Sequence, residues 1–453
     1  MDNMKRVEIL SEIVGSPNVH HSSPHTGLYS VDGMVPTLVL FPGNIEETCQ
    51  ILTRASQEKG SITPWGSGTK IGWGKIPTRV DWIVCTKRLN RITDCDDANL
   101  TVTTEAGVPL STVQELLKGR GRGYFIPLDP SFSQTATVGG IVATNSSGPK
   151  RHLYGTPRDL ILGLGIILPN GIQNVWGGRT VKNVAGYDMT KLYIGSFGTL
   201  GLISEVTFRI LPLPEKRTTF VATFNASLTA FEGVSKIIQS ELLPSAVEVL
   251  NSKVIETLDL QLSGKEAPIL LAVDFEGFEE SVRRQIGQVK EMIGPFHPNA
   301  LHLLEGARQE KFWTGIRDFE SVVRLSFPDS ISCKIQVPIS KTAEVFHLLE
   351  ETADRMGLDR GFRCHAGSGI IDMDFLLEDL NPLVEDFIRT LDGLREKMRA
   401  FEGSIVIKRA PLPLKSRIDV WGPLGKDLIL MQRLKASFDP DRLLNPGRFV
   451  GGI

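Results

Sequence analysis

A histidine in a small, glycine-rich segment is the most suggestive chemical group of this chain. The segment reads CHAGSGIID over residues 364–372, with His365 near its start and Asp372 at its end. A second histidine in such a segment would make a typical metal-ligand pattern, but here an aspartate stands in its place. Two possibilities stay open. Either the chain carries out chemistry at this segment, or it only houses a cofactor for another subunit.

Glycine-rich loops in the first half of the chain are suited to bind phosphate groups. The first loop, PWGSGTKIGWG at 64–74, contains four glycines that permit positive φ angles and a close approach of the backbone to a ligand. Successive backbone N–H groups in such a loop form an anion site, and Ser67 and Thr69 add hydroxyl donors. A plain surface loop has the same composition, so this loop does not decide the matter alone.

A second segment, 127–164, repeats this chemistry. It places Gly139 and Gly140 inside an apolar run, and small polar residues that suit a flat ligand close to the backbone come next. Arg151 and Arg158 are candidates to face phosphate, with an ordinary surface position as the alternative. The small polar residues are Asn145, Ser146, Ser147 and Gly148.

The third segment, 177–210, has Gly195, Gly198 and Gly201 directly before an apolar strand. These glycines are not the G-x-G-x-x-G dinucleotide motif, because that motif needs one strand, a tight turn and a helix, with an acidic residue farther along. Here the glycines lie in several distant loops. A ligand that contacts all three segments must be long, and FAD has a suitable length.

The elements expected around these loops divide the chain at a hinge. A strand at 37–41, a helix opened by Asn44 with Glu47 as its capping-box partner, and a following strand predict a βαβ-like start. The hinge is LPLPEK, 211–216, where two prolines break regular structure. Strands and helices then alternate as in α+β units, and an amphipathic helix at 427–440 precedes an irregular tail.

Composition narrows the classes of function. A chain of 453 residues, 41% of them hydrophobic, predicts two or three domains. The net charge of -2, without a long basic run, argues against nucleic-acid binding. No signal-peptide start and no apolar stretch of about 18 residues occur, so no transmembrane segment is expected. The five scattered cysteines argue against a disulfide framework or an iron–sulfur cluster in this chain.

The three segments together resemble the FAD-binding domain of flavoproteins of the vanillyl-alcohol oxidase and p-cresol methylhydroxylase (PCMH) type. The motifs ATVGGIVATNSSG and VKNVAGYDMTKLYIGSFGTLGLI carry the resemblance. It implies an α+β fold, with a two-subdomain PCMH-type FAD-binding domain followed by an α+β cap domain that contains an antiparallel sheet. The expected parts are an N-terminal helical segment at 1–30, the FAD-binding domain at 31–214, the cap at 215–425, and a C-terminal helix and tail at 426–453 that return to the FAD-binding domain.

The resemblance also implies how FAD is held. Some relatives attach the flavin covalently through a histidine in the first loop, but the corresponding region here offers Lys70, so noncovalent FAD is expected. The first loop would cradle the pyrophosphate. The implied FAD-binding residues are Gly66, Ser67, Gly68, Thr69, Lys70, Pro130, Thr137, Gly139, Gly140, Asn145, Ser147, Gly148, Tyr154, Gly155, Gly198, Thr199, Gly201 and Ile203.

The metal motif of many related 2-hydroxy-acid dehydrogenases is altered here. Those proteins carry H-A-G-D-G-N-x-H and later G-x-I-x-x-E-H, and the two histidines and the glutamate bind a divalent metal beside the substrate. This chain has Asp372 in place of the second histidine, and in GSIVIKRAP it has Lys408 and Arg409 in place of the glutamate and the last histidine. Because cations cannot bind a metal, no metal is expected.

His365, Lys408 and Arg409 are therefore the candidate catalytic residues, and three interpretations stay open. Lys408 and Arg409 hold a substrate carboxylate while His365 acts as the base. Alternatively, the site has decayed and the flavin serves structure or electron passage. Within either interpretation, His365 can be a core histidine, and the two cations can be solvated strand residues.

The tail LMQRLKASFDPDRLLNPGRF is similar to the FAD-binding E subunits of bacterial glycolate oxidases. This similarity implies an FAD-binding subunit of a complex that oxidises glycolate or D-lactate and passes electrons to an iron–sulfur subunit and to a second FAD-linked oxidase subunit. A cytoplasmic location is expected, with peripheral attachment to the inner membrane face through a partner left open. The alternatives are a free-standing FAD-dependent D-2-hydroxy-acid dehydrogenase and a flavin-free scaffold subunit.

Overall fold

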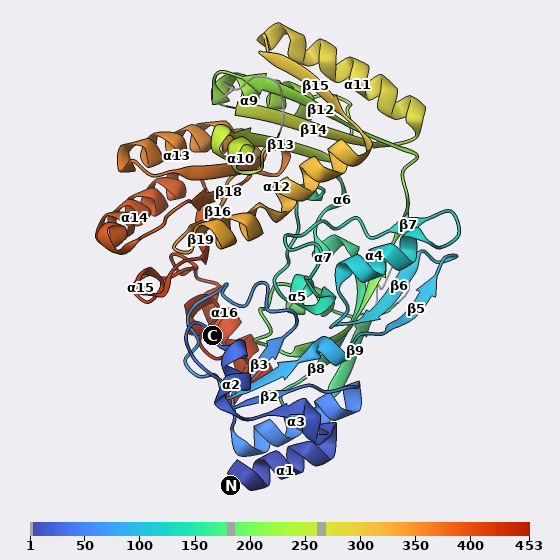
Figure 1. Cartoon of the computed structure of the whole chain (residues 1–453), viewed down its shortest axis with the longest axis vertical. Helices are drawn as coiled ribbons and strands as arrows, with labels where there is room; N and C mark the ends of the chain where they lie inside the picture. The colour runs from blue at the N-terminus through green and yellow to red at the C-terminus, as the bar shows by residue number, and fades with distance from the viewer. Residues whose placement is uncertain (1–2, 179–185, 261–268) are drawn as a thin grey trace.

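The computed structural model describes residues 3–178, 186–260 and 269–453. Figure 1 shows an N-terminal domain with the chain start at its tip, and a cap built around one broad sheet. The N-terminal domain contains two sheets that pack on separate cores. None of the helices formed by the described residues is both long enough and apolar enough to cross a membrane.

The first sheet has four short strands in the order β1 (Val19–His20), β2 (Leu38–Leu40), β4 (Trp82–Cys85) and β3 (Ile62–Trp65). Strands β2 and β3 both run parallel to β4, and helix α3 (Ile45–Glu58) connects them, as the βαβ-like start predicts. The Asn44 side chain accepts a hydrogen bond from the Glu47 backbone N–H at 2.8 Å, which confirms the predicted N-cap. The glycine loop 64–74 therefore leaves the end of β3 at a fixed position.

The second sheet is antiparallel and supports the other two segments. Its strand order is β5 (Ile92–Asp96), β6 (Thr101–Glu105), β10 (Leu202–Arg209), β8 (Ile161–Ile167) and β9 (Gln173–Gly177). Helix α5 (Val138–Ala143) packs on it, so the polar stretch after α5 points away from this sheet toward the cap. Part of the third segment, 179–185, lies outside the described residues.

The cap is an eight-stranded antiparallel sheet in the order β15-β12-β14-β13-β17-β18-β16-β19. Helices α9 (Ser227–Ile238), α11 (Glu279–Ile293), α13 (Thr342–Met356) and α14 (Val384–Ala400) cover one face. Helices α10 (Ser252–Thr257) and α12 (Gly306–Ser326) cover the other. The strands are β12 (Lys216–Phe224), β13 (Ala246–Asn251), β14 (Ile269–Gly277), β15 (Ala300–Leu304), β16 (Ile331–Gln336), β17 (Arg360–His365), β18 (Ile370–Phe375) and β19 (Ser404–Arg409).

After the cap, helix α16 (Leu428–Phe438) and the tail lie against the N-terminal domain (Figure 1). Lys435, buried on α16, donates to the Thr199 carbonyl at 2.7 Å and pairs with Asp439 at 2.6 Å. Leu444 forms a bridge beside Ile62 of β3. These contacts tie the C-terminal helix and tail to the third segment and to the strand that precedes the first glycine loop.

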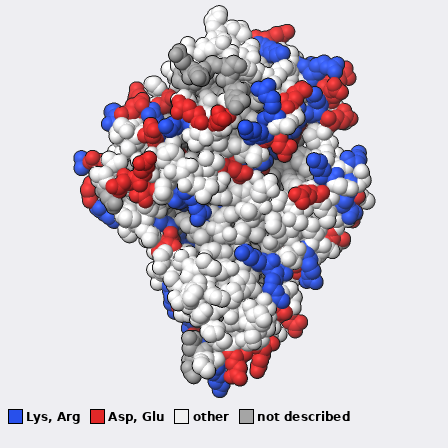
Figure 2. Space-filling view, viewed as in Figure 1, with Lys and Arg blue, Asp and Glu red and all other residues white. Residues whose placement is uncertain are grey.

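The predicted α+β class with an antiparallel cap sheet is confirmed. The hinge at 211–216 is more ordered than predicted, because Leu211 and Pro212 pair with Tyr124 and Phe125 as a two-stranded ribbon. The longest helix, α12, was not predicted. On the face shown in Figure 2, the described Lys and Arg side chains are interspersed with Asp and Glu, in keeping with the net charge of -2.

Candidate active site

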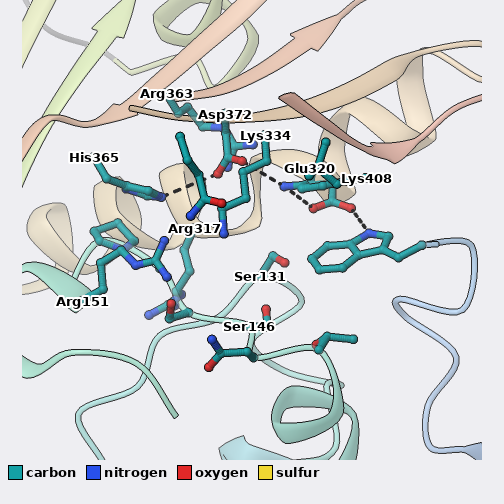
Figure 3. Close-up of a pocket in the computed structure, with 18 of the residues that line it drawn as sticks. Ser131, Ser146, Arg151, Arg317, Glu320, Lys334, Arg363, His365, Asp372 and Lys408 are labelled. Atoms are coloured by element: carbon teal, nitrogen blue, oxygen red, sulfur yellow. Dashed lines mark hydrogen bonds and ion pairs between the residues drawn. The ribbon is translucent and has the colours of Figure 1, made fainter. Parts of the chain in front are cut away.

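A cavity of about 180 Å³ lies between the N-terminal domain and the cap. The stretch after α5, including Asn145 and Ser147, lines it from the N-terminal domain. Helix α12 and the cap strands line it from the other side, and the close-up in Figure 3 shows their charged side chains converging on one space. The cavity is therefore built from segments that are far apart in the sequence.

A second, narrower groove continues from this cavity. It has a volume of about 80 Å³ and is lined by the glycine loop at 64–71, together with Thr137 and Gly140 of the second segment. Thr144 and Phe197 line both spaces, so the groove and the cavity meet. One long ligand can thus run from the glycine loop to the cap.

The residues along this path fit a long polar cofactor. Asn145 Oδ1, Ser147 Oγ and Asn445 Oδ1 are buried and have no hydrogen-bond partner among the described residues. Buried polar atoms are normally paired, so a bound ligand with polar groups would complete them. A Cβ on Gly66 would lie 2.1 Å from Thr137 Oγ1, so only glycine allows the loop to pass this close to α5.

His365 is buried at the edge of the cavity between two carboxylates. Its Nδ1 lies 2.6 Å from Glu248 Oε1, because the two residues face each other in the pairing of β13 with β17. Its Nε2 lies 3.6 Å from Asp372 Oδ2. Burial opposes the charged imidazole, but the two carboxylates outweigh it and raise the pKa of His365 above its ordinary value.

Lys408 forms a buried ion-pair network that shares Asp372 with His365. Its Nζ lies 3.2 Å from Asp372 Oδ1 and 3.2 Å from Glu320 Oε2. Trp73 donates to the other oxygen of Glu320 at 3.0 Å and places its ring 5.2 Å from the Lys408 ammonium. Burial disfavours the charged ammonium, but the two carboxylates have the larger effect and raise the pKa of Lys408 well above its usual range. Each charge in this network already has a partner.

Three other cations line the cavity without such a partner. No carboxylate of the described residues lies within 4 Å of the charged groups of Arg151, Arg317 or Lys334. Burial, and next the like charge of Arg151, lower the pKa of Lys334 to about 8. In Figure 3, Lys334 enters the cavity from the cap and Arg151 from the N-terminal domain. This arrangement is suited to bind an anion.

The predicted cofactor residues fall into three groups. Gly66, Ser67, Gly68, Thr69, Lys70, Thr137 and Gly140 line the groove, and Asn145, Ser147 and Gly148 line the cavity. The remaining residues line neither space; Tyr154, for example, donates to Glu276 at 2.6 Å, and the Thr199 carbonyl accepts from Lys435. This third group is Pro130, Gly139, Tyr154, Gly155, Gly198, Thr199, Gly201 and Ile203.

The three predicted catalytic residues are not brought to one place. His365 and Lys408 both line the cavity. Arg409 is outside the described lining, because its guanidinium donates to Ser330 Oγ at 2.7 Å and to the Pro328 carbonyl at 2.9 Å. Successive residues of a strand point to opposite faces, so Lys408 and Arg409 cannot both face the cavity.

Several lining residues were missed in the sequence. Arg317 and Glu320 lie on the unpredicted α12, and Lys334 lies in a predicted strand but carried no motif. Glu248 becomes visible only through the pairing of β13 with β17. The apolar spacing of α12, with Phe312, Trp313, Ile316, Phe319 and Val323 buried, was the available signal for that helix. Trp73, Phe197, Asn445 and Arg448 were also missed.

Known protein families match both halves of this architecture. The FAD binding domain family matches residues 36–175. The family of FAD linked oxidases, C-terminal domain, matches residues 213–406 and 424–449. Among the described residues, no cluster of three or more His, Cys, Asp or Glu side chains is arranged to hold a metal.

Three relatives extend over nearly the whole chain. The glycolate oxidase subunit GlcD of Bacillus subtilis is 29% identical, covering 97% of this chain and 96% of that protein. The mitochondrial D-lactate dehydrogenase [cytochrome] of Arabidopsis thaliana is 27% identical, covering 95% and 76%. The D-lactate dehydrogenase of Archaeoglobus fulgidus is 27% identical, covering 91% of each chain.

Solved structures agree on the fold. p-Cresol methylhydroxylase with substrate bound superposes with a TM-score of 0.79 at 17% identity, over 98% of this chain and 96% of that one. Alkyldihydroxyacetonephosphate synthase gives 0.75 at 16%, over 99% and 86%. The fold is thus that of PCMH-type flavoproteins. The chain contains an FAD binding domain and a C-terminal domain of FAD linked oxidases, its cofactor is FAD, and the predicted class of FAD-dependent oxidoreductase is confirmed.

Proposed function

We propose that this chain is an FAD-binding subunit of a complex that oxidises a 2-hydroxy acid, such as glycolate or D-lactate. The observation that carries the proposal is the junction of the FAD groove with a cavity that contains His365 and cations without partners. A carboxylate is the natural counter-ion for such cations. The names of the relatives, a glycolate oxidase subunit and D-lactate dehydrogenases, support the same class of substrate.

The cap cations Lys334 and Arg317 would anchor the substrate carboxylate. Lys408 and Arg409 were predicted for this role, but Lys408 is held by two carboxylates and Arg409 bonds away from the described cavity lining. Lys334 has no partner within the described residues, and the buried Nε of Arg317 is also unpaired. A carboxylate held by both cations would fix the orientation of the substrate, and it would neutralise part of the positive charge of the cavity.

His365 would take the proton of the substrate hydroxyl. A carboxylate at Nδ1 accepts a hydrogen bond, so Glu248 favours the tautomer that carries its proton at Nδ1 and leaves Nε2 for proton transfer. Hydride acceptance is the chemistry that FAD supplies when it is bound. Gly66, Ser67 and Thr69 would hold its pyrophosphate, and Asn145 and Ser147 would bond its ring end.

Electrons must leave through other subunits. The five cysteines are free and scattered, with no spacing typical of an iron–sulfur cluster. We therefore propose an iron–sulfur subunit and a second FAD-linked oxidase subunit as partners, in the E-subunit role, at a cytoplasmic location. Peripheral attachment to the inner membrane face would occur through a partner. The relative GlcD is itself called a subunit, which supports an assembly.

A free-standing D-2-hydroxy-acid dehydrogenase is the second candidate, favoured by the D-lactate dehydrogenases that match over most of their length. Anaerobic mixing of the purified yellow chain with D-lactate or glycolate separates the candidates. Bleaching of the flavin without partners would favour the free-standing enzyme. Bleaching only in the reconstituted complex would favour the subunit. A colourless protein that takes up no FAD would contradict both and leave the scaffold alternative.

A further inference from the structure

Lys70 is a buried cation at the place where the FAD groove meets the cavity. It lines the groove, and only 7% of its surface is exposed. Its Nζ donates to the carbonyl of Ser131 at 3.2 Å and lies 5.9 Å from the ring centre of Trp73. Both of these residues line the cavity rather than the groove. The ammonium of Lys70 therefore lies at the end of the groove that opens into the cavity.

The charge of Lys70 has no close counter-ion within the described ranges. No carboxylate oxygen there lies within 4 Å of its Nζ, whereas Lys75 of the same loop region pairs with Asp419 at 3.2 Å. Burial lowers the pKa of Lys70 to about 8, and the more distant charge of Glu320 only partly offsets that effect. An isolated ammonium is costly to bury, so a bound group that carries negative charge would stabilise it.

FAD can supply negative charge in two places. Its pyrophosphate is always anionic, and its ring gains negative charge when it is reduced. The glycine loop is assigned to the pyrophosphate, and Asn145 and Ser147 in the cavity are assigned to the ring end. The groove also contains Arg448, whose buried Nε is unpaired among the described residues and is available to the pyrophosphate. The position of Lys70 beside the cavity thus favours the ring.

We infer that Lys70 faces the flavin ring and raises its reduction potential by stabilising the charge of the reduced form. Two electrons and one proton pass as a hydride from the substrate α-carbon to the flavin, and His365 takes the hydroxyl proton. The 2-hydroxy acid becomes a 2-oxo acid, the ring gains one negative charge, and Lys70 keeps its proton. This inference rests on the proposed function, which places the ring end of FAD at the cavity.

Neutral variants of Lys70 test this inference without any substrate. Spectroscopic titration of the FAD-loaded chain against reference dyes should give a potential about 30 mV or more lower in Lys70→Met, which corresponds to about 10-fold weaker binding of reduced relative to oxidised FAD. Flavin fluorescence should show that the affinity for oxidised FAD changes by less than about 2-fold. Lys70→Gln keeps a donor for the Ser131 carbonyl and should show the same shift, so it maintains the test if the methionine variant folds poorly.

Two further variants serve as controls. Lys70→Arg keeps the charge and should keep most of the potential. Lys75→Met removes a paired lysine that lines neither space, and it should leave the potential unchanged. A shift in Lys75→Met as large as that in Lys70→Met would overturn the inference, because the position of the charge would then not matter.

The other outcomes are equally distinct. Unchanged potentials in both neutral variants would overturn the inference. If oxidised and reduced FAD lose affinity equally, the inference also fails and Lys70 serves the pyrophosphate. If the potential shifts as expected but no 2-hydroxy acid bleaches the flavin in the assembled complex, the proposed substrate class fails while the contact of Lys70 with the ring stands.

Discussion

Lys334 should make substrate affinity depend on pH in a defined window. Its ammonium lines the cavity, and burial, followed by the like charge of Arg151, lowers its pKa to about 8 in the ligand-free protein. A bound carboxylate favours the charged form, so binding raises this pKa. Affinity is complete below about pH 8, where Lys334 is already charged, and it falls as the pH rises through that value.

The size of the effect can be worked out from the same pKa. With a value of about 8, the charged fraction of Lys334 falls from about nine-tenths at pH 7 to about one-tenth at pH 9. A carboxylate partner typically raises the pKa of a lysine by about 1 to 3, so the bound state is at least half charged at pH 9. The dissociation constant of a monocarboxylate should therefore rise about 5- to 10-fold between pH 7 and pH 9.

Calorimetric titration of the FAD-loaded protein with D-2-hydroxybutyrate measures this change. Near pH 8 the observed heat should vary with the ionisation enthalpy of the buffer, because binding takes up part of a proton. Lys334→Arg keeps the charge at all these pH values and should remove the slope while retaining affinity. A flat profile in the unaltered protein would refute the argument. A slope that persists in Lys334→Arg would assign the titration to another group, with His365 the first to consider.

Further outcomes follow from the cofactor loop and the buried charges. Gly148→Ala should strongly lower FAD content, measured by absorbance, because a Cβ there would lie 2.0 Å from a backbone carbonyl, whereas Gly72→Ala has nothing within 4 Å and should stay yellow. Lys408→Met should lower the free energy of unfolding by about 3–5 kcal/mol in urea titrations, since two buried carboxylates lose their partner; an unchanged midpoint would contradict the network. Glu248→Gln should lower the pKa of His365 and move the acid limb of flavin reduction to lower pH, because the base becomes neutral earlier; a limb that stays in place would exclude His365 as the base. Long dialysis against EDTA should leave flavin reduction unchanged, and a loss restored by a divalent metal would refute the metal-free site.

The sequence predicted those elements of the fold whose local patterns are strong. The helix after Asn44 has a capping residue and apolar residues at helical spacing, and short apolar strands bounded by glycine or proline are hard to mistake. FAD followed from loops whose glycine spacing excluded the compact dinucleotide motif. Residues that line the groove were found where they stand in such a loop, as at 66–70.

The charges of the cavity could not be predicted in the same way. Glu320, Asp372 and Lys408 lie on α12, β18 and β19, and the strand order β18-β16-β19 brings them together out of sequence order. No local pattern encodes which strand inserts between two others. Likewise, β17 pairs with β13, which places Glu248 against His365. The sequence showed which residues of the metal motif are replaced in this chain. Only the strand order determines which of the charged residues form ion pairs with one another.

This pairing changes what the altered motif means. If Lys408 and Arg409 had replaced a metal as the substrate anchor, both would need a free charge in the cavity, and neither has one within the described residues. Lys408 instead neutralises the two carboxylates beside it, so the wall is held together without an ion from solution. The charges left for an anion are those on Lys334, Arg317 and Arg151, which no sequence motif marked. Three half-buried cations without a carboxylate partner among the described residues would repel one another, and an anion bound in the cavity would neutralise them. Their retention therefore favours a cavity that still binds an acid.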